Sequence, residues 1–153
     1  MALQGPIPVS FDMVFPHGCY VVGDVEPVKD FDASTNGRFV QSRDKLTGDP
    51  VWQVAVMDAD PTVKAGQKTV AVKILSTVQP VPPAPLPDSP FTPVEFDNVT
   101  VTPYVNGAGR LAYSIKVRAM RAPRRAAVPT KHTTTSASAK DTASTTTSKE
   151  IAA

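Results

Sequence analysis

The sequence predicts an all-β protein, built as a small antiparallel barrel of about five or six strands with a disordered C-terminal tail. Three observations lead to this fold class. Apolar and polar residues alternate with a period of two in several segments, which is typical of half-buried strands. Turn-forming residues lie between these segments. Sixteen of the 153 residues are proline, about twice the average share, and proline interrupts helices.

The three clearest strands are predicted at Val51–Asp58, Thr69–Leu75 and Leu111–Met120. In the first, Trp52 shares a face with Val54 and Val56 and is expected to anchor the core. In the last, the polar residues Lys116 and Arg118 alternate with apolar ones, so they are expected on the outer face of the sheet.

Two turns are predicted to join strands into hairpins. The turn Asp44–Pro50 (DKLTGDP) follows a strand at Arg38–Arg43 and leads into the strand at Val51. The turn Asn106–Gly109 (NGAG) connects Val99–Val105 to the strand at Leu111. An opening strand at Cys19–Val25 completes a set of about six, and no amphipathic helix longer than two turns is found, which favours a barrel or a sandwich.

The folded domain is expected to span residues 1–122. Residues 79–93 contain seven prolines and are predicted to form a stiff loop, because each proline fixes φ and removes a backbone donor. Residues 123–153 are predicted to be disordered, since half of the 24 residues from 130 onward are Ser or Thr and cannot bury enough apolar surface to offset the entropy of ordering. The positive charge is concentrated there: residues 121–153 hold six Lys and Arg against two Asp and Glu, whereas residues 1–120 hold ten against twelve.

Residues suited to catalysis or to metal binding are scarce. The single cysteine, Cys19, excludes an intrachain disulfide and a thiolate cluster. His17 lies two residues earlier, but two ligands are only half of a four-ligand site. Asp58 and Asp60 are explained as turn residues at the end of a strand, and no glycine-rich phosphate loop is present. We therefore expect no enzyme activity, no metal and no cofactor.

The sequence also lacks membrane and export signals. No apolar stretch reaches the roughly 18 residues that a spanning helix needs. Gly5, Pro6, Pro8 and Asp12 interrupt the apolar residues near the start, so this segment does not resemble a secretory signal. A cytoplasmic protein without a membrane partner is expected.

A nucleic-acid-binding face is predicted on the outside of the barrel. Proteins that bind single strands combine cations for the phosphates with aromatic platforms on which bases stack. The candidate residues are Arg38, Phe39, Arg43, Lys45, Lys73, Tyr104, Lys116 and Arg118. Phe39 and Tyr104 are the expected platforms. The competing interpretation is that these cations only solubilise the sheet, since residues 1–120 carry a net charge of −2.

Two resemblances extend this prediction. The segment Arg43–Val54 (RDKLTGDPVWQV) resembles the first long hairpin of bacterial single-stranded-DNA-binding proteins, so the barrel is expected to be OB-like. A second resemblance covers residues 1 to about 123. It rests on GPIPV (5–9), VFPHG (14–18), DFD (30–32), the 43–54 hairpin, VQPVPP (78–83), FTPVEF (91–96) and TPYV (102–105). Together these segments are similar to the actinobacterial plasmid replication, integration and excision activators.

The second resemblance implies an accessory or regulatory role in the replication and excision of an integrative plasmid, a mobile genetic element. Combined with the predicted face, it suggests a protein that contacts single-stranded DNA on a β-sheet. One alternative is an interaction module that recruits a replication initiator or another regulatory protein of the plasmid without touching DNA. A sequence-specific activator that reads duplex DNA is disfavoured, because no helix-turn-helix pattern is found.

Overall fold

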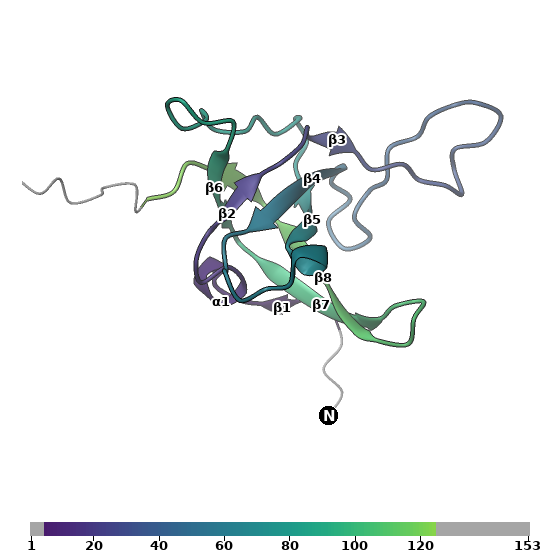
Figure 1. Ribbon diagram of the computed structural model, residues 1–153. Coiled ribbons are helices and arrows are strands. Elements are labelled where there is room, and N and C mark those ends of the chain that lie inside the picture. Colours follow the sequence, from purple (N-terminus) through teal and green to yellow (C-terminus); the bar gives the residue numbers. More distant parts are fainter. Residues whose placement is uncertain (1–4, 125–153) are drawn as a thin grey trace, which may run out of the picture.

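The computed structural model describes residues 5–124, and nearly all of its regular structure is β (Figure 1). The strands are β1 (Ile7–Pro8), β2 (Cys19–Val21), β3 (Glu26–Pro27), β4 (Val51–Asp58), β5 (Thr69–Leu75), β6 (Thr92–Asp97), β7 (Thr100–Val105), β8 (Leu111–Val117) and β9 (Ala119–Arg121). The helices are short: α1 covers Phe11–Val14, and the 3₁₀ turn η1 covers Ala65–Gln67. The expected all-β class is therefore confirmed.

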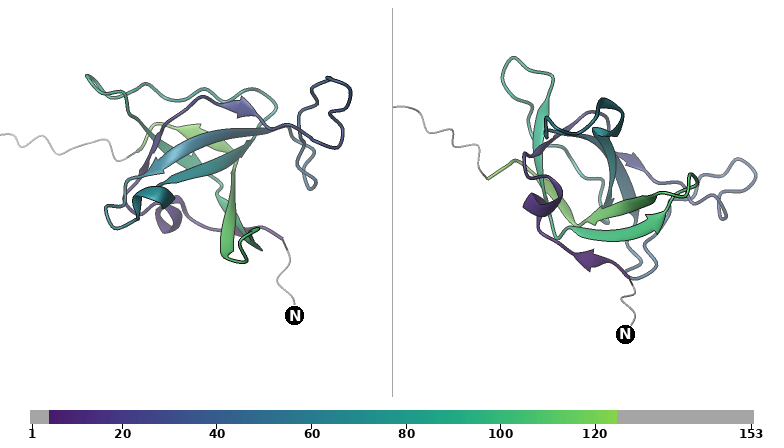
Figure 2. Two further views of the ribbon diagram at one scale, coloured as in Figure 1. Left: turned by 45° about the vertical axis from the view of Figure 1, so that its right-hand side comes forward. Right: turned by 60° about the horizontal axis from the view of Figure 1, so that its bottom comes forward.

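The strands form one strongly curled, barrel-like sheet (Figure 2) in the order β1-β7-β8-β5-β4-β2-β6-β9, with β3 added beside β4. Strands β6 and β7 are separated by only Asn98 and Val99, and Asn98 turns the chain with a φ of 52°. This bent segment pairs with β2 through β6 and with β8 through β7, so it links the two ends of the curl. All pairs are antiparallel except β5 with β8, which run parallel and correct the expectation of a purely antiparallel barrel.

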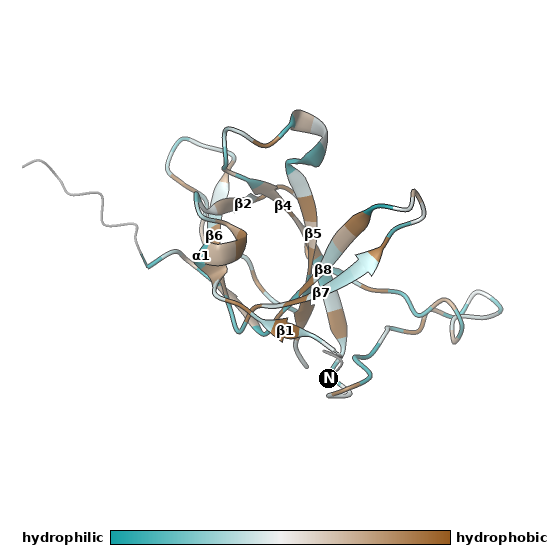
Figure 3. Cartoon of the chain, turned by 90° about the horizontal axis from the view of Figure 1, so that it is seen from below, coloured by the Kyte–Doolittle hydropathy of each residue, from teal (hydrophilic) through white to brown (hydrophobic). Residues whose placement is uncertain are grey.

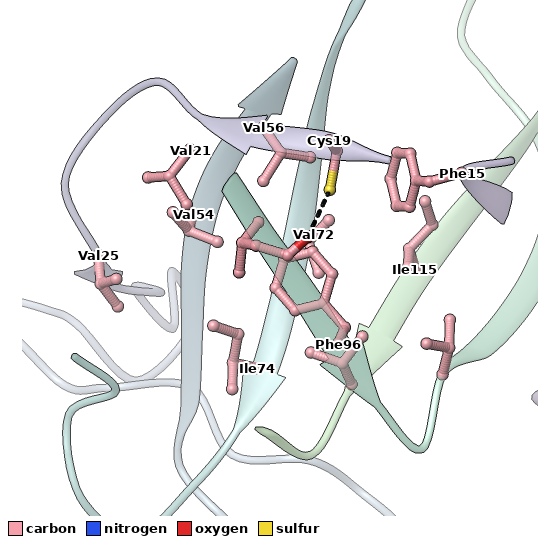
Figure 4. Close-up of a cluster of buried hydrophobic side chains, with 13 residues drawn as sticks. Phe15, Cys19, Val21, Val25, Val54, Val56, Val72, Ile74, Phe96 and Ile115 are labelled. Carbon is pink, nitrogen blue, oxygen red and sulfur yellow. Dashed lines mark hydrogen bonds between the residues drawn. The ribbon is translucent and has the colours of Figure 1, made fainter. Parts of the chain in front are cut away.

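Alternate side chains along the strands point to the inside of the curled sheet and pack together there (Figure 4). The buried cluster consists of Phe15, Cys19, Val21, Val25, Val54, Val56, Val72, Ile74, Val94, Phe96, Val99, Ile115 and Val117. Trp52 is only partly buried and packs against the edge of this cluster, with its Nε1 donating to the carbonyl of Ser76 at 2.9 Å. The centre of the core is thus aliphatic and phenyl in character, and Trp52 borders it.

The first predicted hairpin differs most from the structure. Residues 38–43 form no strand, and the chain between β3 and β4 is a long loop held by two isolated bridges, Lys29 with Gln41 and Arg43 with Pro50. We call residues 28–50 the long loop. The opening strand is also shorter than expected, since β2 ends at Val21 just before Gly23 and Asp24, residues that disfavour strands. Strand β6 was not predicted because it directly follows the proline-rich segment and contains Pro93 itself.

The second hairpin forms as predicted but projects beyond the barrel. Strand β8 pairs with β5 only from Ile115 to Val117, so its first residues have no neighbour on that side. Leu111 and Tyr113 follow the alternation of the core face and yet are 64% and 56% exposed. Figure 3 shows hydrophobic colour reaching this outer half of the β7–β8 hairpin.

The C-terminal strand closes the described part of the chain. Arg121 Nη2 lies 2.7 Å from Glu95 Oε1, and Arg121 Nε lies 3.0 Å from Asp97 Oδ2. The backbone N–H of Arg124 also donates to Glu95, so the ordered contacts extend two residues past the predicted domain boundary at 122.

The tail predicted at 123–153 lies outside the described residues from 125 onward. No helix in the part of the chain that the structure describes is both long and apolar enough to cross a membrane.

Candidate nucleic-acid interface

The outer face of the sheet carries one polar row across four strands. Gln53 on β4 pairs with Lys73 on β5, Lys73 pairs with Lys116 on β8, and Lys116 pairs with Thr100 on β7. Since directly paired residues point to the same side of a sheet, these side chains project together. The two lysines predicted from sequence are therefore neighbours in the sheet.

Small side chains follow this row along the sheet. Ala55 pairs with Ala71 across β4 and β5, and Thr102 pairs with Ser114 across β7 and β8. A surface of small residues leaves room for a ligand to lie close to the backbone.

The cations of this face differ in their partners. Among residues 5–124, Lys73 makes no ion pair within 4 Å. Lys116 Nζ lies 2.6 Å from Asp44 Oδ1, and Arg118 Nη1 lies 2.5 Å from Asp49 Oδ2. The long loop thus supplies a carboxylate to each of these two predicted binding residues, and only Lys73 is left with an uncompensated charge on the row.

Asp44 is positioned by the turn that it begins. Its Oδ2 accepts hydrogen bonds from the backbone N–H groups of Leu46 and Thr47 and from the Thr47 hydroxyl, the local pattern for which Asp is favoured in turns. Gly48 then takes a φ of 76°, which costs a glycine little. The hydrogen bond from Lys116, followed by its positive charge and the turn N–H groups, outweighs burial and lowers the pKa of the Asp44 carboxyl.

The long loop presents aromatic and basic side chains to solvent. Arg38, Phe39 and Lys45 are exposed. Arg43 is also exposed, and its Nη1 donates to the carbonyl of Gly48 at 2.9 Å, so it braces the turn.

Phe31 is a candidate that the sequence prediction missed. It is 81% exposed, and Lys29 Nζ lies 5.7 Å from the centre of its ring, within the range of a cation–π contact. The signal available in the sequence was a lone phenylalanine between two aspartates, in a stretch without alternation. That position favours a loop, and an aromatic residue in an exposed loop has no core to fill.

The β7–β8 hairpin supplies the remaining aromatic residue. Tyr104 is half exposed and pairs with Ala112, so it points to the same side as the polar row. The tip is fixed by Asn106, whose Oδ1 accepts from the N–H groups of Ala108 and Arg110. Strand register places this tip at the Thr69 end of β5, whereas the long loop joins β4 at the Leu75 end. By strand direction, the two projecting segments therefore leave the sheet toward opposite ends of β5.

The residues weighed for other chemistry lie apart from this face. Cys19 is buried, its thiol donates to the Val94 carbonyl at 3.7 Å, and burial, aided by Asp58, raises its pKa to about 12. A thiol of that kind is a poor nucleophile or ligand near neutral pH. Asp60 accepts hydrogen bonds from the hydroxyl and the backbone N–H of Thr62, which lower the pKa of its carboxyl as turn contacts do. Within residues 5–124, no three His, Cys, Asp or Glu side chains converge in a way that could hold a metal ion.

Comparison of the chain with models of protein families, with curated proteins and with solved structures finds no match.

Proposed function

We propose that this protein binds single-stranded DNA across the outer face of β4 and β5, as an accessory factor in the replication and excision of an integrative plasmid. The observation that carries the DNA-binding part is the arrangement of the face. The row includes Lys73, which makes no ion pair within residues 5–124, and the two projecting segments beside the row expose aromatic residues. The role on a mobile element rests on the resemblance of the sequence segments described above.

The order and direction of the strands support this location of the site. If the two-residue strand β3 is left out and the bent β6–β7 segment is counted as one strand, β5 is the third strand from β2 and β8 is the fifth, and the two are parallel neighbours, as the third and fifth strands are in OB folds. OB folds bind oligonucleotides on the face of their second and third strands and with the loops that flank it. Here those elements are β4 and β5, the long loop, and the tip of the β7–β8 hairpin.

The geometry disfavours a helix-based reader of duplex DNA. Such readers place a helix in the major groove against the base edges, and the longest helix among residues 5–124 has four residues. Exposed rings beside isolated cations suit unstacked bases, because every base has a face on which an aromatic ring can stack.

Phe39 is expected to contribute by stacking. Phe39→Ala should weaken binding of a fluorescently labelled 30-nucleotide oligothymidylate by roughly five- to tenfold. Loss of one stacked base costs about 1 to 3 kcal/mol, and the exposed position of Phe39 places the effect at the lower end of that range. Fluorescence anisotropy at low salt measures the affinity. Phe39→Leu is the matched control for apolar area: it should restore little of the affinity if the ring itself is needed. Equal affinities for wild type and Phe39→Ala would contradict this assignment.

Lys73 is expected to contact a phosphate. Lys73→Gln should lower the affinity for the same oligonucleotide and reduce the slope of log affinity against log salt by about 0.7, the share of one phosphate contact on a single strand. Arg124→Gln is the control, because Arg124 is an exposed cation on the far β6–β9 side of the sheet. A Lys73→Gln slope equal to that of the control variant would place the phosphates elsewhere.

A second candidate function is recruitment of a plasmid replication initiator or regulatory protein without DNA contact. The observation that favours it is the apolar side of the projecting hairpin, where Val105, Leu111 and Tyr113 are all more than half exposed. Exposed apolar side chains that lie together often mark protein interaction sites. For this second function, a purified replication initiator should bind the protein after nuclease treatment, and Leu111→Ser should weaken that binding. The oligonucleotide assay should show no signal.

A further inference from the structure

Two ion pairs hold residues 44–49 of the long loop against the end of β8. Asp44 pairs with Lys116 on β8, and Asp49 pairs with Arg118, the first residue after β8. The paired residues are 72 and 69 positions apart in the chain. Both cations lie at the Leu75 end of the outer face, because β8 runs parallel to β5.

The two pairs differ in how firmly the carboxylate is held. The Asp44 side chain is 3% exposed and has three hydrogen bonds from the turn besides its contact with Lys116. The Asp49 side chain is 25% exposed and Arg118 is 43% exposed. Among residues 5–124, Arg118 is the only recorded side-chain partner of the Asp49 carboxylate. Asp44 therefore anchors the turn, whereas the contact between Asp49 and Arg118 is accessible to solvent and to competing anions.

A small hollow lies directly beside these groups. It has a volume of about 170 Å³ and is lined in part by Lys116, Arg118, Thr100 and Thr47. Its lining combines two cations and two hydroxyl groups, which are groups that contact phosphate oxygens, with the carboxylate of Asp44, the side chain of Asn98 and four apolar residues.

We infer that Asp49 acts as an internal phosphate mimic, which masks Arg118 and so limits the affinity of the protein for nucleic acid. This inference rests on the proposed function and concerns the regulation of that same face. Carboxylate and phosphate compete for a guanidinium with the same fork geometry. A DNA phosphate that approaches Arg118 must displace the Asp49 carboxylate and is also repelled by its charge. Arg118 therefore makes no contact with DNA in the wild-type protein, and it contacts DNA once the Asp49 charge is removed.

The inference predicts a specific pattern among four proteins: wild type, Asp49→Asn, Arg118→Gln and the double variant. Asp49→Asn should bind the labelled 30-nucleotide oligothymidylate about three- to tenfold more tightly at low salt, with a salt slope steeper by about 0.7. Arg118→Gln should weaken binding less than Lys73→Gln does, because it removes no phosphate contact and only leaves the Asp49 charge uncompensated. The double variant should not show the higher affinity of Asp49→Asn, because that increase depends on Arg118.

A matched control separates this effect from a general change in charge. Asp88→Asn also removes one exposed carboxylate, and its φ of 56° is one that asparagine accepts. Asp88 belongs to the proline-rich loop, which extends across the top of the view in Figure 1 to the left, whereas the long loop extends to the right. Circular dichroism melting curves check that each variant is folded, and Asp49→Ser serves as a second variant if Asp49→Asn is not.

Each outcome is decisive. An Asp49→Asn affinity no higher than that of Asp88→Asn overturns the masking, as does an Arg118→Gln loss as large as that of Lys73→Gln. If the wild type binds and only these comparisons fail, the inference falls and the proposed function stands. If neither the wild type nor Asp49→Asn binds, both fall. If only Asp49→Asn binds, the masking is supported in its strongest form.

Discussion

Phe96→Ala is expected to remove a large part of the stability of the domain. The Phe96 side chain is 2% exposed, and its ring centre lies 6.2 Å from that of Phe11. Truncation of a buried phenylalanine costs about 3 to 5 kcal/mol, because the apolar contacts are lost and a cavity remains. A domain of this size has a free energy of unfolding of roughly 5 to 15 kcal/mol. Urea denaturation followed by circular dichroism measures the change.

Phe39→Ala is the matched control for this substitution. The same atoms are removed from a ring that is 53% exposed on the long loop, so the free energy of unfolding should change by less than about 0.5 kcal/mol. Phe96→Leu should lie between the two, since it retains part of the buried volume. Similar losses for Phe96→Ala and Phe39→Ala would mean that the curled sheet does not enclose Phe96.

Regular alternation made the central strands predictable. The segments Val51–Asp58 and Thr69–Leu75 coincide with β4 and β5, because their valines and isoleucines occupy every second position. The segment at residues 38–43 lacks this alternation, and the residues that precede β4 remain a loop. The parallel pairing of β5 with β8 could not be inferred, since local alternation specifies the faces of a strand and not its neighbours.

The candidate site was only partly predictable for a related reason. Alternation placed Lys73 and Lys116 on the outer face, where the structure makes them neighbours. It could not reveal that Asp44 and Asp49 reach Lys116 and Arg118, because these contacts join residues about 70 positions apart. Alternation alone would also place Tyr113 in the core, yet its side chain is 56% exposed, because β5 pairs with β8 only from Ile115 onward. Tertiary contacts decide which of the periodic positions are covered and which charges are compensated.

The ion pair between Lys116 and Asp44 leads to the second large effect. Lys116→Met should lower the free energy of unfolding by about 3 kcal/mol at pH 7, because removal of one partner leaves an uncompensated carboxylate in a buried site. This value is at the lower end of the range for buried pairs, since the Lys116 side chain is itself 29% exposed while Asp44 is 3% exposed. Urea denaturation at pH 7 measures the loss.

The loss of unfolding free energy in Lys116→Met should depend on pH, because it depends on the charge of the Asp44 carboxyl. Its pKa is lowered in the folded state from 3.8, so its contribution is present above that pH and disappears as the pH falls through the lowered value. The difference between wild type and Lys116→Met should therefore be full at pH 7 and smaller at pH 3. Lys64→Met, at an exposed lysine before η1, should show little loss at either pH. An equal loss for Lys116→Met at both pH values would show that the packing of the lysine stem, and not its charge, stabilises the long loop.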